Sequence, residues 1–291
     1  MADNAHSITK KKVGLVLGGD GEKGLAHIGV IKELERVGLE ISYITGTSMG
    51  ALVGAWYAST KDIKTLENLF LNVKKDDVYP ARHIARKHNG PIFKDSSIPD
   101  FLEEHFRKFN FEDCKIPFKA IATDVKNGEQ VILEKGNIAD AVRASTALPV
   151  IFSPVQIDGR LLMDGGFVNP IPAGIAKEMG AEFIIAVDVS SKWLNLSEEH
   201  LNVLHIYALI ASAMSVIEFQ IANRVLIGNA DIILRPKVIN HHWLDFSSAK
   251  ELIAHGEIEA HERISEICEH AGHTMPEKPP FEKFMDFILY D

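Results

Sequence analysis

The five residues GTSMG at positions 46–50 form the pattern G-x-S-x-G around Ser48. On a turn from a strand into a helix this pattern is a nucleophile elbow, because its glycines permit a tight turn that exposes the serine hydroxyl. The amino end of the following helix would favour an anion that develops beside the serine. The pattern is weak by itself, but the apolar run ISYIT precedes it and a run of small helix-compatible residues follows. We therefore expect Ser48 to be a nucleophile.

A glycine-rich loop follows the first apolar run and has the pattern G-x-G-x-x-G at Gly19, Gly21 and Gly24. Dinucleotide-binding loops share this pattern but need an acidic residue at the end of the second strand. Glu40 stands before that strand instead, and the pattern G-x-x-x-x-G-K-[ST] is absent from the sequence. Amide groups of such a loop bind anions of any kind. Since neighbouring parallel strands end at the same edge of a sheet, we expect this loop beside Ser48, where it would hold the oxyanion of a tetrahedral intermediate.

A serine nucleophile needs a base, and Asp164 in the stretch LLMDGGFVNPIP is the candidate. It follows an apolar run, and the two glycines behind it allow a close approach of the chain. Its carboxylate could then accept the Ser48 proton directly. An aspartate in this context is also a common turn residue, and the sequence alone leaves both interpretations open.

Histidine offers the alternative base. His27 lies three residues after Gly24 on the first predicted helix, where it would support the loop or the core. A Ser–Asp–His triad of the hydrolase type places its histidine after the aspartate. Four histidines satisfy that order without a recognisable loop context: His205, His241, His242 and His255. No carboxylate or cysteine lies at ligand spacing from the pair at 241–242, so we expect no metal site.

Short apolar runs alternate with longer helical patterns, which predicts an α/β fold with a mainly parallel sheet. The predicted strands are 13–17, 41–45, 118–123, 130–133, 183–189 and 231–235, with strand or turn segments at 152–156 and 161–163. The predicted helices include 24–37, one that begins near Ser48, and 138–145, and the regions 61–111 and beyond about 200 are mostly helical.

The chain has 291 residues, a formal net charge of −9 and two cysteines. The negative charge argues against nucleic acid as a partner and against strong electrostatic attachment to anionic lipid. The basic stretch 74–88 is most simply a solvated loop. The amino-terminal residues lack the apolar segment of a secretory signal. The run 201–217, which His205 interrupts, predicts no membrane span. It predicts a buried core helix, with a membrane-facing helix as the alternative.

With these motifs in this order, the chain resembles the bacterial patatin-like phospholipases. The matching stretches are GLVLGGDGEKGLAHIGVIKELE, ITGTSMGALVGAWYA, IPFKAIATDVKNGE, AVRASTALPVIFSPV, MDGGFVNPIP, NADIILRP and WLDFSSAKELIAHG, in that order over roughly residues 13–260. The resemblance implies a three-layer α/β/α fold and a serine acyl hydrolase with a Ser–Asp dyad and no catalytic histidine. By position Ser48 is the nucleophile, Asp164 is the base, and Gly19, Gly21, Lys23 and Gly24 match the oxyanion-hole motif.

One residue departs from the family pattern, because Asp20 stands where the loop usually has its middle glycine. Aspartate tolerates a positive φ better than most residues, but its charge would oppose an oxyanion unless it points to solvent or pairs with Lys23. The alternative function is therefore a catalytically weakened protein that binds an acyl lipid or has a regulatory role. A lysine at position 23 in place of arginine keeps the charge without the planar fork.

The combined interpretation is a cytoplasmic hydrolase that cleaves carboxylic esters of phospholipids, lysophospholipids or related acyl lipids through an acyl-enzyme. It implies no metal and no organic cofactor, and it implies peripheral membrane contact through apolar loops. We expect a flexible segment at 1–12, the phospholipase domain at 13–270 and a tail at 271–291. The sequence leaves the oligomeric state open.

Overall fold

The structure is a computed structural model that describes residues 9–72, 97–149, 152–190, 206–238 and 248–276. Its strands form a single eight-stranded sheet in the order β5-β6-β3-β2-β1-β7-β8, with β4 paired to β3 outside this path. The strands are β1 (Val13–Leu17), β2 (Ile41–Thr47), β3 (Phe118–Asp124), β4 (Gln130–Leu133), β5 (Val155–Ile157), β6 (Arg160–Asp164), β7 (Phe183–Val187) and β8 (Ile232–Leu234).

The sheet is parallel at its centre and antiparallel at one side. Strand β1 pairs in parallel with β2 and β7, and the parallel part continues from β2 to β3 and from β7 to β8. Strands β4 and β6 join β3 in the antiparallel direction, and β5 joins β6 in the same way. The carboxyl ends of β1 and β2 therefore lie side by side, while β6 brings its own carboxyl end to the sheet from the opposite direction.

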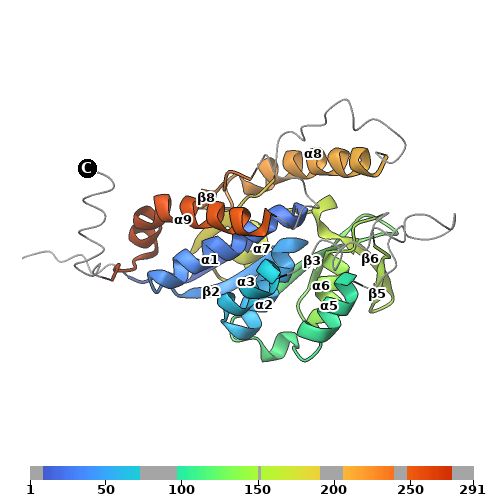
Figure 1. The fold of residues 1–291 in the computed structure, drawn as a ribbon, viewed down its shortest axis with the longest axis horizontal. Coiled ribbons are helices and arrows are strands. Elements are labelled where there is room, and N and C mark those ends of the chain that lie inside the picture. The colour runs from blue at the N-terminus through green and yellow to red at the C-terminus, as the bar shows by residue number, and fades with distance from the viewer. Residues whose placement is uncertain (1–8, 73–96, 150–151, 191–205, 239–247, 277–291) are drawn as a thin grey trace, which may run out of the picture.

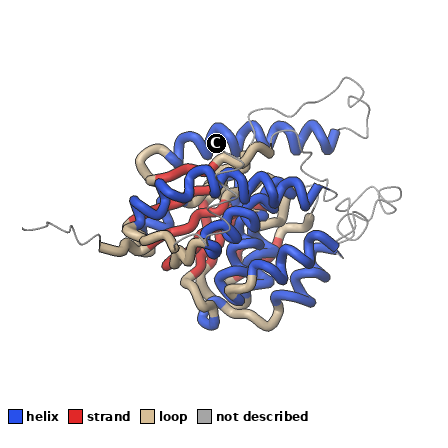
Figure 2. Tube along the Cα trace, turned by 60° about the vertical axis from the view of Figure 1, so that its left-hand side comes forward, coloured by secondary structure: helices blue, strands red, loops and turns tan. Residues whose placement is uncertain are grey.

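Helices cover both faces of the sheet, as Figure 2 shows. The described helices are α1 (Ala26–Arg36), α2 (Met49–Thr60), α3 (Ile63–Asn72), α5 (Ser97–Phe106), α6 (Ile138–Ser145), α7 (Ala173–Glu178), α8 (Ile206–Leu226) and α9 (Ala249–Ala271). Alternate residues of β1 belong to different clusters, because Leu15 and Leu17 pack with α1, α2 and α9 whereas Val16 packs with α7 and α8. This alternation is the period of a strand, and it confirms the predicted three-layer α/β/α architecture.

Helices α1 and α9 lie along each other in Figure 1 and pack through glycines. A β-carbon added to Gly29 would lie 2.0 Å from the Ile253 carbonyl oxygen, and one added to Gly256 would lie 1.9 Å from the Ala26 carbonyl oxygen. The two backbones are therefore in direct contact at this crossing.

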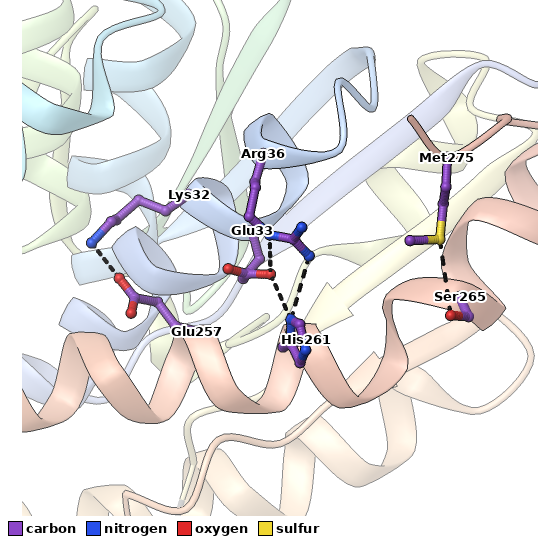
Figure 3. A network of polar contacts seen from close by, with 7 residues as sticks. All are labelled: Lys32, Glu33, Arg36, Glu257, His261, Ser265 and Met275. Carbon is purple, nitrogen blue, oxygen red and sulfur yellow. Dashed lines mark hydrogen bonds and ion pairs between the residues drawn. The ribbon is translucent and has the colours of Figure 1, made fainter. Parts of the chain in front are cut away.

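Polar side chains flank the same helix pair, as Figure 3 shows. Lys32 of α1 forms an ion pair with Glu257 of α9. Glu33 accepts a hydrogen bond from Arg36 Nε at 2.9 Å and lies 3.2 Å from His261 Nδ1. These contacts are partly exposed, so we assign the strength of the α1–α9 contact to backbone packing and regard the ion pairs as minor.

Most predicted elements are confirmed within a few residues. The predicted helix 24–37 is confirmed as α1, and the residues directly before it form a 3-10 helix, η1 (Gly21–Leu25). Strand β2 continues to Thr47, two residues past the predicted end. The predicted basic loop 74–88 lies outside the described residues.

The prediction of a buried core helix at 201–217 is only partly correct. Residues 201–205 lie outside the described part of the chain, and within α8 the side chains of Met214 and Ser215 are buried while Val216 and Ile217 are about half exposed. None of the helices in the described ranges is both long and apolar enough to span a bilayer.

Replacement of Gly29 by alanine should destabilise the fold. The added methyl group would force α1 and α9 apart at a cost of about 3 kcal/mol, while alanine gains about 1 kcal/mol in helix propensity. We expect the free energy of unfolding in urea to fall by about 2 kcal/mol. Gly174 of α7 is the matched control, because its added β-carbon would meet its nearest atom only at 4.0 Å. Gly174→Ala should leave stability unchanged or raised, and equal losses in both variants would contradict the packing argument.

Candidate active site

Ser48 occupies the turn between β2 and α2. Its backbone has φ 54° and ψ −123°, a strained conformation for a residue with a side chain. The flanking glycines make the turn possible, because a β-carbon on Gly50 would lie 2.1 Å from the Leu17 carbonyl oxygen and one on Gly46 would lie 2.4 Å from the Gly50 carbonyl oxygen. The elbow predicted from the sequence is therefore present, with Ser48 at the amino end of α2.

The side chains of Ser48 and Asp164 are in direct contact. The Ser48 hydroxyl donates a hydrogen bond to Asp164 Oδ2 at 2.7 Å, and the Gly166 amide donates to Asp164 Oδ1 at 2.8 Å. A β-carbon on Gly165 would lie 2.3 Å from the Ile121 carbonyl oxygen, so this glycine lets the chain turn tightly against β3. Asp164 is also a turn residue, since it caps the short 3-10 helix η4 (Gly165–Phe167). It is therefore both the hydrogen-bond partner of Ser48 and the turn residue that the sequence left as alternatives.

Burial dominates the electrostatics of Asp164. Desolvation raises the pKa of this carboxyl group from 3.8 to about 6, against the hydrogen bonds from Gly166 and Ser48, which lower it. A carboxylate with a pKa near 6 is a stronger base than an exposed aspartate and is still largely ionised at neutral pH. The group is therefore suited to accept a proton from the serine hydroxyl that already points at it.

The glycine-rich loop lies against the elbow. A β-carbon on Gly19 would lie 3.3 Å from Ser48 Cβ, and one on Gly24 would lie 2.5 Å from Met49 Cγ. The Gly19 amide already donates to the Pro170 carbonyl at 3.1 Å. The role of this glycine is therefore to let the loop approach the serine closely, rather than to supply a free amide. Gly21 has φ 59° and begins η1, which places the later amides of the loop at the start of a helix.

Asp20 is buried and paired. Its carboxylate accepts from Lys23 Nζ at 2.8 Å, with 0% of the lysine side chain and 3% of the aspartate side chain exposed, and Ser215 of α8 donates to its other oxygen at 3.0 Å. Asp20 has φ 124°, well outside the left-handed helical region that aspartate tolerates. The Lys23 charge is therefore engaged with Asp20, and the Asp20 charge has a buried counter-ion.

His27 supports the loop, as the sequence predicted. Its Nε2 lies 2.8 Å from the Gly18 carbonyl oxygen, and because a carbonyl only accepts, Nε2 carries the proton. Burial lowers the pKa of His27 to about 4, so the ring is neutral at neutral pH. Among the hydrogen bonds described for Ser48 and Asp164 none involves a histidine. His255 lies on α9, and the other three candidates, His205, His241 and His242, fall outside the described ranges.

Two further side chains hold the elbow and the Asp164 backbone in place. The hydroxyl of Ser145 accepts from the Ser48 amide at 2.9 Å and donates to the Ile121 carbonyl at 2.6 Å. Thr123 donates to the backbone carbonyl of Asp164 at 2.7 Å. Sequence reasoning did not single out either residue, although both lie in stretches that carried the family resemblance.

Comparison with known proteins agrees with the family resemblance of the sequence. The family model described as "Patatin-like phospholipase" matches residues 15–177. Patatin-like phospholipase domain-containing protein 6 of Mus musculus is 32% identical over 200 residues, which cover 65% of this chain and 14% of that protein. Lysophospholipase NTE1 of Scheffersomyces stipitis is 30% identical over 275 residues, which cover 85% of this chain and 18% of that protein. This chain thus spans less than a fifth of the length of either relative.

A solved structure, that of VipD from Legionella pneumophila, superimposes with a TM-score of 0.46 and 14% identity, covering 88% of this chain and 67% of that one. The two sequence relatives are eukaryotic, and the bacterial origin implied by the resemblance stays a prediction.

The pair of Asp20 and Lys23 should stabilise the loop. Asp20→Asn keeps a hydrogen-bond acceptor for Ser215 but removes the carboxylate beside a fully buried ammonium group, which typically costs about 3 kcal/mol or more. Urea denaturation should show this loss. Glu40→Gln removes the exposed ion pair between Lys10 and Glu40 and should leave stability unchanged. If Asp20→Asn is as stable as the unmodified protein, the buried pair does not hold the loop.

The raised pKa of Asp164 should make the fold less stable as pH increases. The folded state holds the Asp164 proton more tightly than the unfolded chain does, so this contribution to stability is full below about pH 4 and is lost as pH rises through about 6. Asp164→Asn removes the effect, and near neutral pH this variant should be more stable by about 3 kcal/mol. The figure follows because each tenfold difference in proton affinity between the folded and unfolded chain corresponds to about 1.4 kcal/mol.

His27 titrates with the opposite sign. Its lowered pKa contributes stability above about pH 6.5 that is lost as pH falls through about 4. Asp164→Asn should therefore lose stability on acidification more steeply than the unmodified protein, because one of the carboxyl groups whose raised pKa opposes the His27 contribution is then absent. Ser59→Ala is the control, because the Ser59 hydroxyl donates to the Ala55 carbonyl and leaves Asp164 and its partners in place, so its stability should vary with pH as in the unmodified protein. Parallel stability curves for Asp164→Asn and the unmodified protein would contradict the assignment.

Proposed function

Since this chain belongs to the patatin-like phospholipase family, we propose that it is a serine acyl hydrolase that cleaves carboxylic esters of phospholipids, lysophospholipids or related acyl lipids. The observation that carries the proposal is the hydrogen bond of 2.7 Å between Ser48 Oγ and the buried carboxylate of Asp164. A nucleophile with its base in place, on a strained turn at a helix amino end, is the arrangement that acyl transfer requires.

The proposed reaction has two steps. Asp164 accepts the Ser48 proton as Oγ attacks the ester carbonyl, the tetrahedral intermediate expels the alcohol with that proton, and an acyl-enzyme remains. Water then loses a proton to Asp164 and attacks the acyl-enzyme, and the fatty acid leaves as Ser48 regains its proton. Both steps use the same two side chains, and no cofactor enters either of them.

The oxyanion would be held by amides of the loop and of the α2 amino end. The Gly19 amide is bonded to Pro170, so we assign the donors to the later part of the loop, from Gly21 through Lys23 and Gly24, together with the first turn of α2. One such donor typically lowers the activation free energy by about 3–4 kcal/mol. Lys23 would take part through its backbone, since its ammonium group is engaged with Asp20.

The weakened, lipid-binding alternative rested on the charge of Asp20. That charge is compensated by Lys23 and by the Ser215 hydroxyl, which weighs in favour of the hydrolase. We further expect a cytoplasmic protein that contacts membranes peripherally. The physiological lipid and the bond cleaved in it are left to experiment.

Covalent labelling with a fluorophosphonate probe tests the proposal. We expect the unmodified protein to label, Ser48→Ala not to label, and Asp164→Asn to label at least about 100-fold more slowly, because general bases contribute that much or more. Ser59→Ala is the matched control, since Ser59 is a buried serine of α2 whose hydroxyl donates to the Ala55 carbonyl. A folded protein that stays unlabelled would overturn the hydrolase proposal in favour of the binding protein.

The pH profile of ester hydrolysis tests the base. Asp164 must be ionised to accept the serine proton, so kcat/KM should fall on the acid side with a midpoint near the Asp164 pKa of about 6. An acid limb near the ordinary aspartate pKa would show that burial does not raise the pKa of the base. Thermal denaturation measured at each pH separates this effect from acid unfolding.

A further inference from the structure

Between residues 215 and 218, helix α8 directs two polar side chains inward and two apolar side chains outward. Ser215 and Glu218 are one turn apart and are 6% and 8% exposed, whereas Val216 and Ile217 are 46% and 48% exposed. A surface helix ordinarily buries its apolar residues. The reversed arrangement places a hydroxyl and a carboxyl group of α8 against the catalytic loops.

The two inward side chains contact both halves of the site. Ser215 donates to Asp20 in the glycine-rich loop at 3.0 Å. The Glu218 carboxyl group lies against Gly166, where an added β-carbon would be 2.2 Å from Glu218 Oε1. The Gly166 amide holds Asp164 Oδ1. Glu218 therefore packs on the peptide unit that orients the base.

Among the described residues, charged groups from three different segments act on Glu218. Asp164 comes from the end of β6, Asp20 from the loop after β1, and Lys23 from η1. Burial and the charges of Asp164 and Asp20 raise the pKa of Glu218 well above its ordinary value, and Lys23 lowers it by less. Lys23 is already paired with Asp20, so an ionised Glu218 would add a negative charge beside the base.

We propose that Glu218 is a positioning residue of the Ser48–Asp164 pair, which fills the place beside Gly166 as a neutral carboxylic acid and so leaves Asp164 as the carboxylate. Two neighbouring carboxyl groups in a shared buried site ionise in sequence, because the first charge opposes the second. The base must be the one that ionises first. If Glu218 took the charge instead, Asp164 would be protonated at neutral pH and Ser48 would have no base.

The inference rests on the proposed hydrolase function, but its first test needs no turnover. Protein labelled with carbon-13 at the glutamate carboxyl carbons is titrated by NMR, and the Glu218 resonance is assigned by its absence in Glu218→Gln, or in Glu218→Asp where the glutamine variant does not fold. We expect a protonated Glu218 near neutral pH. In Asp164→Asn, which lacks the neighbouring charge, Glu218 should ionise at a pH lower by about one unit or more.

The second test uses the acid limb of kcat/KM. Glutamine is neutral like the protonated acid, so Glu218→Gln should leave the acid limb in place and retain most of the rate. Glu262→Gln on the exposed side of α9 is the matched control and should change neither measurement. A Glu218 that is ionised at neutral pH, a midpoint unchanged by Asp164→Asn, or an acid limb lowered by about one unit or more in Glu218→Gln would each overturn the proposal. Absence of esterase activity in the unmodified protein would instead refute the hydrolase function, and the NMR titration would still decide the state of Glu218.

Discussion

The carboxylate of Asp164 is buried, and much of the surrounding structure keeps that group charged and correctly oriented. Removal of a carboxylate from water is unfavourable unless hydrogen bonds replace the water. Here the replacements are one backbone amide and the hydroxyl of the serine itself. These two bonds compensate in part, and the remaining unfavourable energy is what makes Asp164 basic. The same burial therefore weakens the fold and strengthens the base.

The glycine-rich loop shows how a second buried charge is managed. Asp20 stands where the family pattern has a glycine, which carries no charge. The Asp20 charge is compensated by Lys23 and Ser215, and its backbone has an unusual positive φ. The ammonium group of Lys23 is engaged with Asp20 and is not available to a substrate. The loop is thus fixed by a buried ion pair and by neutral His27, and the chemistry proposed for it uses backbone amides.

The sequence predicted the features that depend on local patterns. The strand–elbow–helix unit around Ser48 follows from an apolar run, two glycines and a helix of small residues, and the position of Gly19 beside Ser48 follows from the order of parallel strands. Features that depend on long-range packing were missed. Nothing local in ASAMSVIEF indicates that Ser215 and Glu218 point inward while Val216 points outward, because tertiary contacts with Asp20 and Gly166 overrode the apolar pattern. Ser145 was missed for a similar reason, since its partners lie in β3 and at the elbow.

The antiparallel entry of β6 has a consequence for the order in which the site is assembled. Ser48 follows the second strand of the chain, but Asp164 lies 116 positions later and is placed beside the serine by the pairing of β6 with β3. A growing polypeptide that has completed β1, β2 and α2 already carries the serine but still lacks the aspartate that accepts its hydrogen bond. The Ser48–Asp164 contact can therefore form only after the antiparallel side of the sheet has been added.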